Sequence, residues 1–301
     1  MGKLDLYLSD VEWFVAIKEH QDSIVENNEI KVKLFKNTWR YWCADPFVFD
    51  YEGHTYVFME VYDKLKQQGY IGYREYKNGK ISKIHVCIKT KFHLSYPFIF
   101  AYENQIYIIP ECYQSSKVIA YKAVSFPNQW EEDTILLDDI KACDTNILEL
   151  ENNRYMLTME LYGQPFQYDR LCLYYQKDGE WIRTKNNPVV LGNKCARNAG
   201  AIFYDKGRMI RPAQNCSDSY GENIYFKEIT EITEDTYCEK EKGSLIATSI
   251  SVTNSKKKFD GIHTFNTNYR YDVIDLRIAK TIQPAKLVGL VIKKVSSLMR
   301  K

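Results

Sequence analysis

Long hydrophobic runs are missing from this sequence of 301 residues. No stretch reaches the roughly 18 consecutive apolar residues of a membrane-spanning helix, so we predict no such segment. An excess of one charge is missing as well, because 41 Lys and Arg residues face 39 Asp and Glu residues, for a net charge of +2. Without a strong positive field, nucleic acid is not an expected partner.

Clustered cysteines are also absent. All eight are separated by more than 20 residues: Cys43, Cys87, Cys112, Cys143, Cys172, Cys195, Cys216 and Cys238. This spacing excludes a CxxC metal motif and favours reduced, mostly buried thiols of a cytosolic protein. Acidic residues at Asp5, Asp10 and Glu12 interrupt the apolar region that a signal peptide requires, so we predict no secretion signal.

Aromatic residues are abundant, at 14% of the chain, with 24 tyrosines. Tyrosine suits half-buried β-strands, and its ring offers a flat face on which sugars stack. The composition therefore favours an all-β protein.

A short motif of one polar residue within an apolar strand recurs along the chain about every 50 residues. Its five copies are ADPFVF at 44–49, SYPFIF at 95–100, CDTNIL at 143–148, NAGAIF at 198–203 and GIHTFN at 261–266. The first four are followed by a turn with Gly or Asn, and each copy leads to a second strand. Further alternating segments then predict four strands per unit.

Units of this length with four antiparallel strands are typical of a β-propeller blade. We predict a five-bladed β-propeller over residues 1–275, in which strand-like segments within residues 1–40 complete the last blade. A β-sandwich or a solenoid is the alternative architecture.

Polar residues occupy equivalent positions in successive copies. In the first strands these are Asp45, Tyr96, Asp144, Asn198 or Ala199, and His263. In the second strands they are Glu60, Glu111, Glu160, Gln214 and Asp275. Equivalent positions of inner strands converge on one mouth of a propeller channel, so we expect these side chains to meet there. The alternative is that they are solvated strand ends.

Other polar and aromatic residues in or near the motifs suit a polyhydroxylated ligand. The predicted substrate-binding residues are Trp42, Glu60, His93, Tyr96, Arg197, Asn198, Arg211, Gln214, Tyr220 and His263. His93 and His263 could equally be structural. Neither has an HxxxH or HxxE neighbour, so we predict no metal site, and no motif calls for a cofactor. P-loop, dinucleotide-binding and serine-elbow motifs are absent too.

The segment 276–301 is basic and contains no Asp or Glu. After Pro284 its apolar residues recur with helical spacing, namely Leu287, Leu290, Val291, Val295, Leu298 and Met299. A basic amphipathic helix over Pro284 to Lys301 predicts either binding to an anionic membrane surface or packing on the propeller rim.

Several of these motifs, in this order, resemble one known family. WCADPFVF, FHLSYPFIF, YIIPE, ACDTNI, RNAGAIF, MIRPAQNCSDSYG, NIYFKEITEITEDTY and GIHTFN are similar to the N-terminal propeller domain of glucosamine inositolphosphorylceramide transferase and its stand-alone bacterial relatives. The similarity covers about residues 39–275. It implies a carbohydrate-active fold related to five-bladed arabinanases, xylosidases and fructosidases, and a place in surface-polysaccharide biosynthesis.

Those hydrolases use an Asp as base or nucleophile, a second Asp that orients it, and a Glu as general acid. The resemblance assigns the first role to Asp45 and the second to Asp144. Where the acid is expected, this sequence has Arg197 within CARNAG. Expulsion of a phosphate from an activated donor needs a cation rather than an acid, and Arg197 or Arg211 would suit that reaction.

The leading hypothesis is therefore a glycosyltransferase of cell-surface glycan or glycolipid assembly, with Asp45 as base. One alternative is a glycoside hydrolase or phosphorylase using Asp45 with Glu111 or Glu160. Another is a non-catalytic glycan-binding module. The expected partners are a sugar nucleotide or glycan, an anionic membrane surface and other glycan-biosynthesis enzymes, and the expected location is the cytoplasm, peripheral to the inner face of the membrane.

Overall fold

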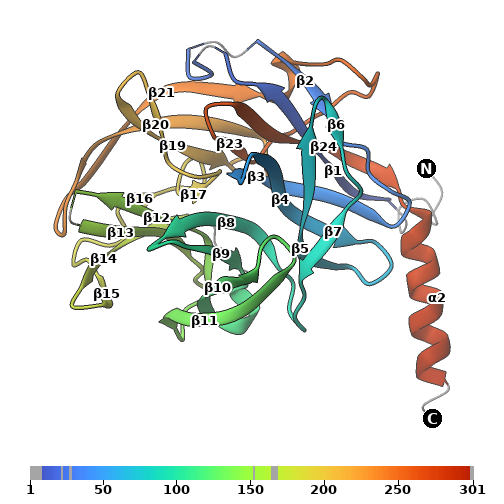
Figure 1. The fold of residues 1–301 in the computed structure, drawn as a ribbon, viewed down its shortest axis with the longest axis horizontal. Coiled ribbons are helices and arrows are strands. Elements are labelled where there is room, and N and C mark those ends of the chain that lie inside the picture. The colour runs from blue at the N-terminus through green and yellow to red at the C-terminus, as the bar shows by residue number, and fades with distance from the viewer. Residues whose placement is uncertain (1–8, 22, 27–28, 152, 164–168, 299–301) are drawn as a thin grey trace.

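A computed structural model describes residues 9–298 except 22, 27–28, 152 and 164–168. Five sheets are arranged around a central channel, so the predicted five-bladed β-propeller with a C-terminal helix is confirmed (Figure 1). Their strands pair in antiparallel fashion except β2 and β22, which pair in parallel. Among the described residues, no helix is long and apolar enough to cross a membrane.

The first three blades follow the chain in order. Blade 1 contains β3 (Tyr41–Tyr51), β4 (His54–Asp63), β5 (Gln68–Lys77), β6 (Lys80–Ile81) and β7 (His85–Ile88). Blade 2 contains β8 (Ser95–Tyr102), β9 (Gln105–Glu111), β10 (Lys117–Ser125) and β11 (Gln129–Asp138). Blade 3 contains β12 (Ala142–Leu150), β13 (Asn153–Glu160), β14 (Arg170–Lys177), β15 (Glu180–Arg183) and β16 (Val190–Leu191).

The inner strand of blade 4 is divided in two. This blade contains β17 (Arg197–Asn198), β18 (Phe203–Asp205), β19 (Arg208–Asn215), β20 (Asn223–Ile232) and β21 (Tyr237–Ile246). Gly200 lies at the break with φ of +136°, a conformation that a residue with a Cβ rarely adopts.

Blade 5 joins the two ends of the chain. It contains β23 (Phe265–Thr267), β24 (Tyr271–Ile282), β1 (Ser9–Glu19), β2 (Ile30–Leu34) and β22 (Ile250–Val252). The antiparallel pairing of β1 with β24 extends from Ser9 opposite Ile282 to Glu19 opposite Tyr271. Strand β24 therefore continues beyond residue 275, where the sequence placed the end of the propeller, and helix α2 (Pro284–Leu298) follows it.

Hydrogen bonds connect neighbouring blades around the channel, and Tyr96 of blade 2 makes two of them. Its backbone N–H donates to Asp45 Oδ2 of blade 1 at 3.1 Å, and its hydroxyl donates to Asn146 Oδ1 of blade 3 at 3.0 Å. Tyr96 is completely buried, so these bonds are shielded from water.

The remaining links close a circle. Asn146 Nδ2 donates to the carbonyl of Gly200 in blade 4 at 2.8 Å. The N–H of Ala201 in blade 4 donates to Asn266 Oδ1 of blade 5, and Asn266 Nδ2 donates to the carbonyl of Pro46 in blade 1, both at 2.7 Å. We call this closed set of contacts the inter-blade ring.

Candidate active site

A cavity of about 350 Å³ lies where the five blades meet, with lining residues from all of them. This volume is in the range of small-molecule sites in proteins. Eight of the predicted residues line it: Trp42, Asp45, Glu60, His93, Glu111, Arg197, Tyr220 and His263.

A β-bulge positions the polar residue of the repeated motif on the inner strands of blades 1 to 3. The register of β3, β8 and β12 shifts at the repeated motif, and the residues there have left-handed φ angles: Asp45 at +50°, Tyr96 at +44° and Asp144 at +51°. A bulge leaves one residue outside the ladder and re-aims its side chain. The backbone conformation at the bulge therefore sets the direction of the side chain at this position.

Asp45 is buried at the base of the cavity and is held from several sides. Besides the Tyr96 N–H, its carboxylate accepts a hydrogen bond from the hydroxyl of Thr264 at 2.8 Å. His263 Nε2 lies 3.6 Å from Asp45 Oδ1. Burial raises the pKa of Asp45 to about 7, although the positive charge of His263 opposes this rise.

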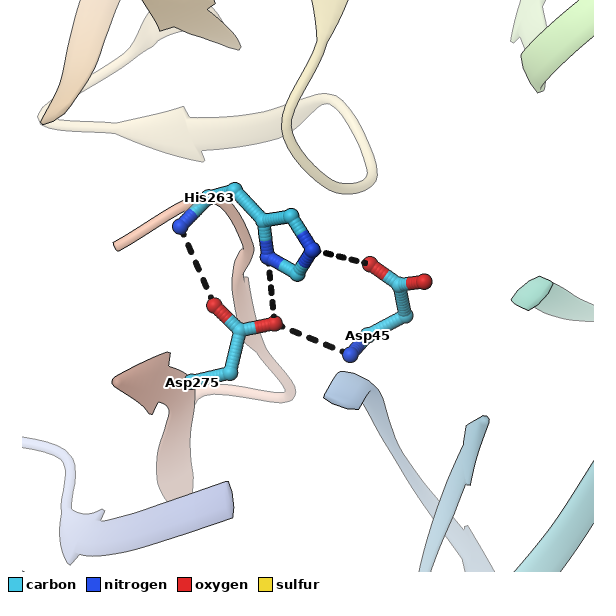
Figure 2. A group of neighbouring side chains, drawn as sticks. All are labelled: Asp45, His263 and Asp275. Atoms are coloured by element: carbon cyan, nitrogen blue, oxygen red, sulfur yellow. Dashed lines mark hydrogen bonds and ion pairs between the residues drawn. The ribbon is translucent and has the colours of Figure 1, made fainter. Parts of the chain in front are cut away.

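Asp275 organises His263 and the backbone of Asp45 (Figure 2). Its carboxylate accepts hydrogen bonds from His263 Nδ1 at 2.6 Å, from the His263 N–H at 3.1 Å and from the Asp45 N–H at 2.9 Å. Burial opposes protonation of His263, but Asp275 and Asp45 outweigh it and raise the pKa of the imidazole. Trp13 stacks on the same ring, with 3.8 Å between ring centroids.

Asp45, His263 and Asp275 are also donors of the kind that bind a metal, and their ligand atoms lie within 4.8 Å of one another. Both oxygens of Asp275 already accept N–H hydrogen bonds. A cation here would have to displace His263 Nδ1 from Asp275. The geometry fits a histidine that is hydrogen-bonded to Asp275 and ion-paired with Asp45 better than a metal centre.

Arg197 occupies the other side of the cavity between two carboxylates. Its Nε donates to Asp144 Oδ2 at 2.5 Å, and its Nη2 donates to Glu111 Oε2 at 3.2 Å. Burial and the neighbouring Asp144 raise the pKa of Glu111 well above its usual range, although Arg197 opposes this rise. The surroundings of Glu111 therefore favour the protonated form of its carboxyl group.

A third charged group lies on blade 1. His93 Nε2 is 3.0 Å from Glu60 Oε1, while His93 Nδ1 accepts the N–H of Gly69 at 3.1 Å. A Cβ at Gly69 would lie 2.6 Å from Glu60 Oε1 and 2.8 Å from His93 Nε2, so only glycine leaves room for this pair. Nearby, the Trp42 ring stacks on Tyr62 at 4.3 Å.

Four predicted residues lie behind the cavity wall. Tyr96 belongs to the inter-blade ring, and Asp144 holds Arg197. Asn198 Nδ2 donates to the Asp144 carbonyl at 2.7 Å, and Gln214 Nε2 donates to the Asn198 carbonyl at 3.1 Å. These residues support the cavity without lining it.

Glu160 does not reach the cavity. In blade 1, Glu60 pairs with Ala44. The equivalent pair in blade 3 is Cys143 with Met159, so Glu160 lies one residue beyond the position of Glu60. Because alternate residues of a strand point to opposite faces, its carboxylate instead accepts hydrogen bonds from Tyr174 and Arg183.

Arg211 does not reach the cavity either. It is completely buried, with its guanidinium paired to Glu239 at 2.8 Å and bonded to Asn198 Oδ1 at 3.2 Å. A buried Arg with a carboxylate partner is a structural ion pair.

Sequence reasoning did not assign a binding role to Trp13, Gln67, Tyr113 or Gln114, which line the cavity. Trp13 comes from the strand that closes blade 5 and lies far from the repeated motif in the sequence. The other three lie just after the second strands of blades 1 and 2, so a search of those connections would have found them.

The chain is similar to known proteins over most of its length. Residues 23–281 match the family described as Glucosamine inositolphosphorylceramide transferase 1, N-terminal. Glucosamine inositolphosphorylceramide transferase 1 of Oryza sativa subsp. japonica is 28% identical over 239 residues, which cover 77% of this chain and 31% of the relative. The Arabidopsis thaliana protein of the same name is 26% identical over 255 residues, which cover 82% of this chain and 32% of the relative. The chain thus spans about a third of the length of these relatives.

Solved structures share the fold at low sequence identity. The catalytic domain of the Coprinopsis cinerea GH62 alpha-L-arabinofuranosidase has a TM-score of 0.58 at 9% identity, covering 86% of this chain and 97% of that one. A family 117 glycoside hydrolase from Zobellia galactanivorans has a TM-score of 0.52 at 13% identity, and the match covers 92% of this chain and 91% of the hydrolase.

Proposed function

This chain belongs to the family of the glucosamine inositolphosphorylceramide transferase 1 N-terminal region, and from that premise we propose that it transfers a glycosyl group in its central cavity during glycolipid or surface-polysaccharide biosynthesis. The substrate class is an activated sugar donor, such as a sugar nucleotide, with a glycan or lipid-linked acceptor.

The observation that carries this proposal is Asp45, a cavity carboxylate with a pKa raised to about 7. A base whose pKa is close to the working pH accepts a proton efficiently from a hydroxyl group. As the acceptor oxygen bonds to the anomeric carbon, its proton passes to Asp45, and the bond from that carbon to the leaving phosphate oxygen breaks. Asp275 orients His263, and the imidazole forms an ion pair with Asp45.

Arg197 supplies the positive charge for the departing phosphate. Its ion pair with Asp144 partly neutralises it. The raised pKa of Glu111 favours its protonated form, and protonation reduces the negative charge around Arg197 and makes an anionic leaving group easier to accommodate.

The test is turnover and thermal stabilisation with a panel of sugar nucleotides, comparing the wild type with Asp45→Asn. We expect a rise in melting temperature with one donor and a loss of nucleotide release of about 10²- to 10⁴-fold in Asp45→Asn. Asp50→Asn is the matched control, because Asp50 lies on the same strand and hydrogen-bonds Thr55 outside the cavity. A shift with neutral glycans only, without turnover, would instead identify a glycan-binding module.

Glycoside hydrolysis is a second candidate function, favoured by the raised pKa of Glu111 in the same cavity as Asp45. A protonated carboxyl facing a carboxylate base is the pair that such hydrolysis requires. Glu111→Gln would then abolish cleavage of poor leaving groups but retain cleavage of activated aryl glycosides. In a transferase, Glu111→Gln would retain nucleotide release.

A further inference from the structure

Helix α2 stands at the edge of the propeller (Figure 1), and contacts within its first two turns attach it to the blades. Ala285 is buried, and Lys286 Nζ pairs with Asp10 of β1 at 3.0 Å. At Gly289 the helix touches the loop between β4 and β5 so closely that a Cβ would lie 2.1 Å from the Leu65 carbonyl. These contacts define the side of the helix that faces the protein.

The apolar side of the helix faces away from the protein. Leu287 and Val291 each come two residues after a body-facing position, which is about 200° further around the helix. They are 40% and 55% exposed, and the apolar residues flanking them have similar exposure: Val288, Ile292 and Val295, at 41%, 53% and 49%. We call these five residues the outer stripe. A surface helix normally shows the reverse, with its apolar side packed on the core.

The charged residues in the described part of the helix are all positive. Lys286 pairs with Asp10, Lys293 comes seven residues later on the same side, and Lys294 borders the outer stripe. Residues 276–301 contain no Asp or Glu. Apolar side chains bordered by lysines match a bilayer whose headgroups are anionic, because the stems of Lys lie along the apolar boundary while their ammonium groups meet phosphates.

A second copy of the chain fits the outer stripe less well. Packing two such stripes side by side in parallel would bring Lys294 of both copies close to one another, and this like-charge contact opposes association. We propose that α2 binds the surface of an anionic membrane through the outer stripe, lying in the interface without crossing the bilayer.

Membrane binding through α2 would also place the cavity beside the headgroups. The anchor residues Leu65 and Asp10 precede the cavity-lining residues Gln67 and Trp13 by two and three positions. Such a separation is at most about 10 Å of extended chain. Part of the cavity wall therefore lies close to the attachment of α2.

Sedimentation with vesicles tests this proposal independently of any turnover. The full chain is mixed with phosphatidylcholine vesicles or with vesicles that also contain about one-third phosphatidylglycerol, a fraction chosen to give a strongly anionic surface. We expect the protein to pellet with the anionic vesicles only. Val291→Asp combined with Val295→Asp should lower the partition coefficient at least about tenfold.

Val124→Asp combined with Ile135→Asp is the matched control. Both residues are exposed to a similar degree, at 59% and 50%, but they lie on blade 2, and the change in net charge is the same. The control should pellet like the wild type, and the melting temperatures of both variants should match that of the wild type.

Two results would overturn the proposal. One is equal distribution of the wild type with and without anionic vesicles. The other is a wild-type dimer in solution, by light scattering, that Val291→Asp and Val295→Asp convert to a monomer, because the outer stripe would then be a contact between copies.

Discussion

At the scale of single residues, the site depends on an uncommon backbone conformation that is repeated. Asp45, Tyr96 and Asp144 share a left-handed φ, which non-glycine residues adopt rarely and at a cost in free energy. Three occurrences at the same bulge indicate that the strain is offset by what each side chain does. Asp45 faces the cavity, Tyr96 links blades, and Asp144 holds Arg197.

Asp45→Asn should stabilise the protein at neutral and higher pH. The pKa of Asp45 is about 7 in the folded protein and about 4 in an unfolded chain, so the folded state binds more protons between these values. Stability of the wild type therefore falls as pH rises through this window, and an Asn side chain escapes the loss. We expect a rise in melting temperature of about 2–5 °C at pH 8, shrinking towards zero at pH 4. A pH-independent difference would contradict the raised pKa.

At the scale of structural elements, the hairpins were predictable and the exact register was not. The motif and the turn at fixed spacing identify the inner strands, because a bulge and a tight turn each demand particular residues. Glu160 was misplaced because the second strands were aligned at their apolar ends. Counting six residues from the first residue after each turn gives Glu60 from His54, Glu111 from Gln105 and Met159 from Asn153.

Side-chain pairing across the sequence was beyond prediction. Arg211 finds its partner in Glu239, and Arg197 finds its partner in Glu111 from another blade. No periodic pattern connects these residues. The sequence alone therefore does not distinguish an arginine that binds a phosphate from one that pairs with a carboxylate. The outward orientation of α2 was hidden for a similar reason, because its contacts depend on loops far away in the chain.

Gly200→Ala should disrupt blade 4. An added Cβ would lie 1.9 Å from the carbonyl oxygen of Phe265, and the φ of +136° excludes other residues. We expect a loss of about 3 kcal/mol or more in the free energy of unfolding, measured by urea denaturation. Gly53→Ala is the control, since Gly53 also has a positive φ but has open space around its Cβ position, and it should lose only about 1 kcal/mol. Similar losses at both sites would show that the close approach at Gly200 is unimportant.

At the scale of the whole molecule, two devices close the propeller. The first is blade 5, which β1 completes by pairing with β24. The second is the inter-blade ring, in which Tyr96, Asn146 and Asn266 carry hydrogen bonds between blades. Because the ring is buried, each group left unpaired costs about 1–3 kcal/mol.

Tyr96→Phe should weaken this closure with little change in packing. It removes one hydroxyl, which donates to Asn146 and accepts the N–H of Gly200 at 3.0 Å. We expect about 2–4 kcal/mol of destabilisation in urea denaturation, since both partners remain buried. Tyr204→Phe, at a position that is 49% exposed, should be nearly neutral. Unchanged stability of Tyr96→Phe would mean that the inter-blade ring does not stabilise the closed propeller.

Tyr96 contacts two other blades at once. Its hydroxyl donates to Asn146 of blade 3, and its backbone N–H donates to the carboxylate of Asp45 in blade 1. The proton affinity of Asp45 is thereby connected to how well blades 2, 3 and 4 fit together. A ligand or partner that shifts these blades would change the fraction of molecules with an ionised Asp45 without touching this residue. The Tyr96 amide would report this in solution, because its nitrogen chemical shift should follow the ionisation of Asp45.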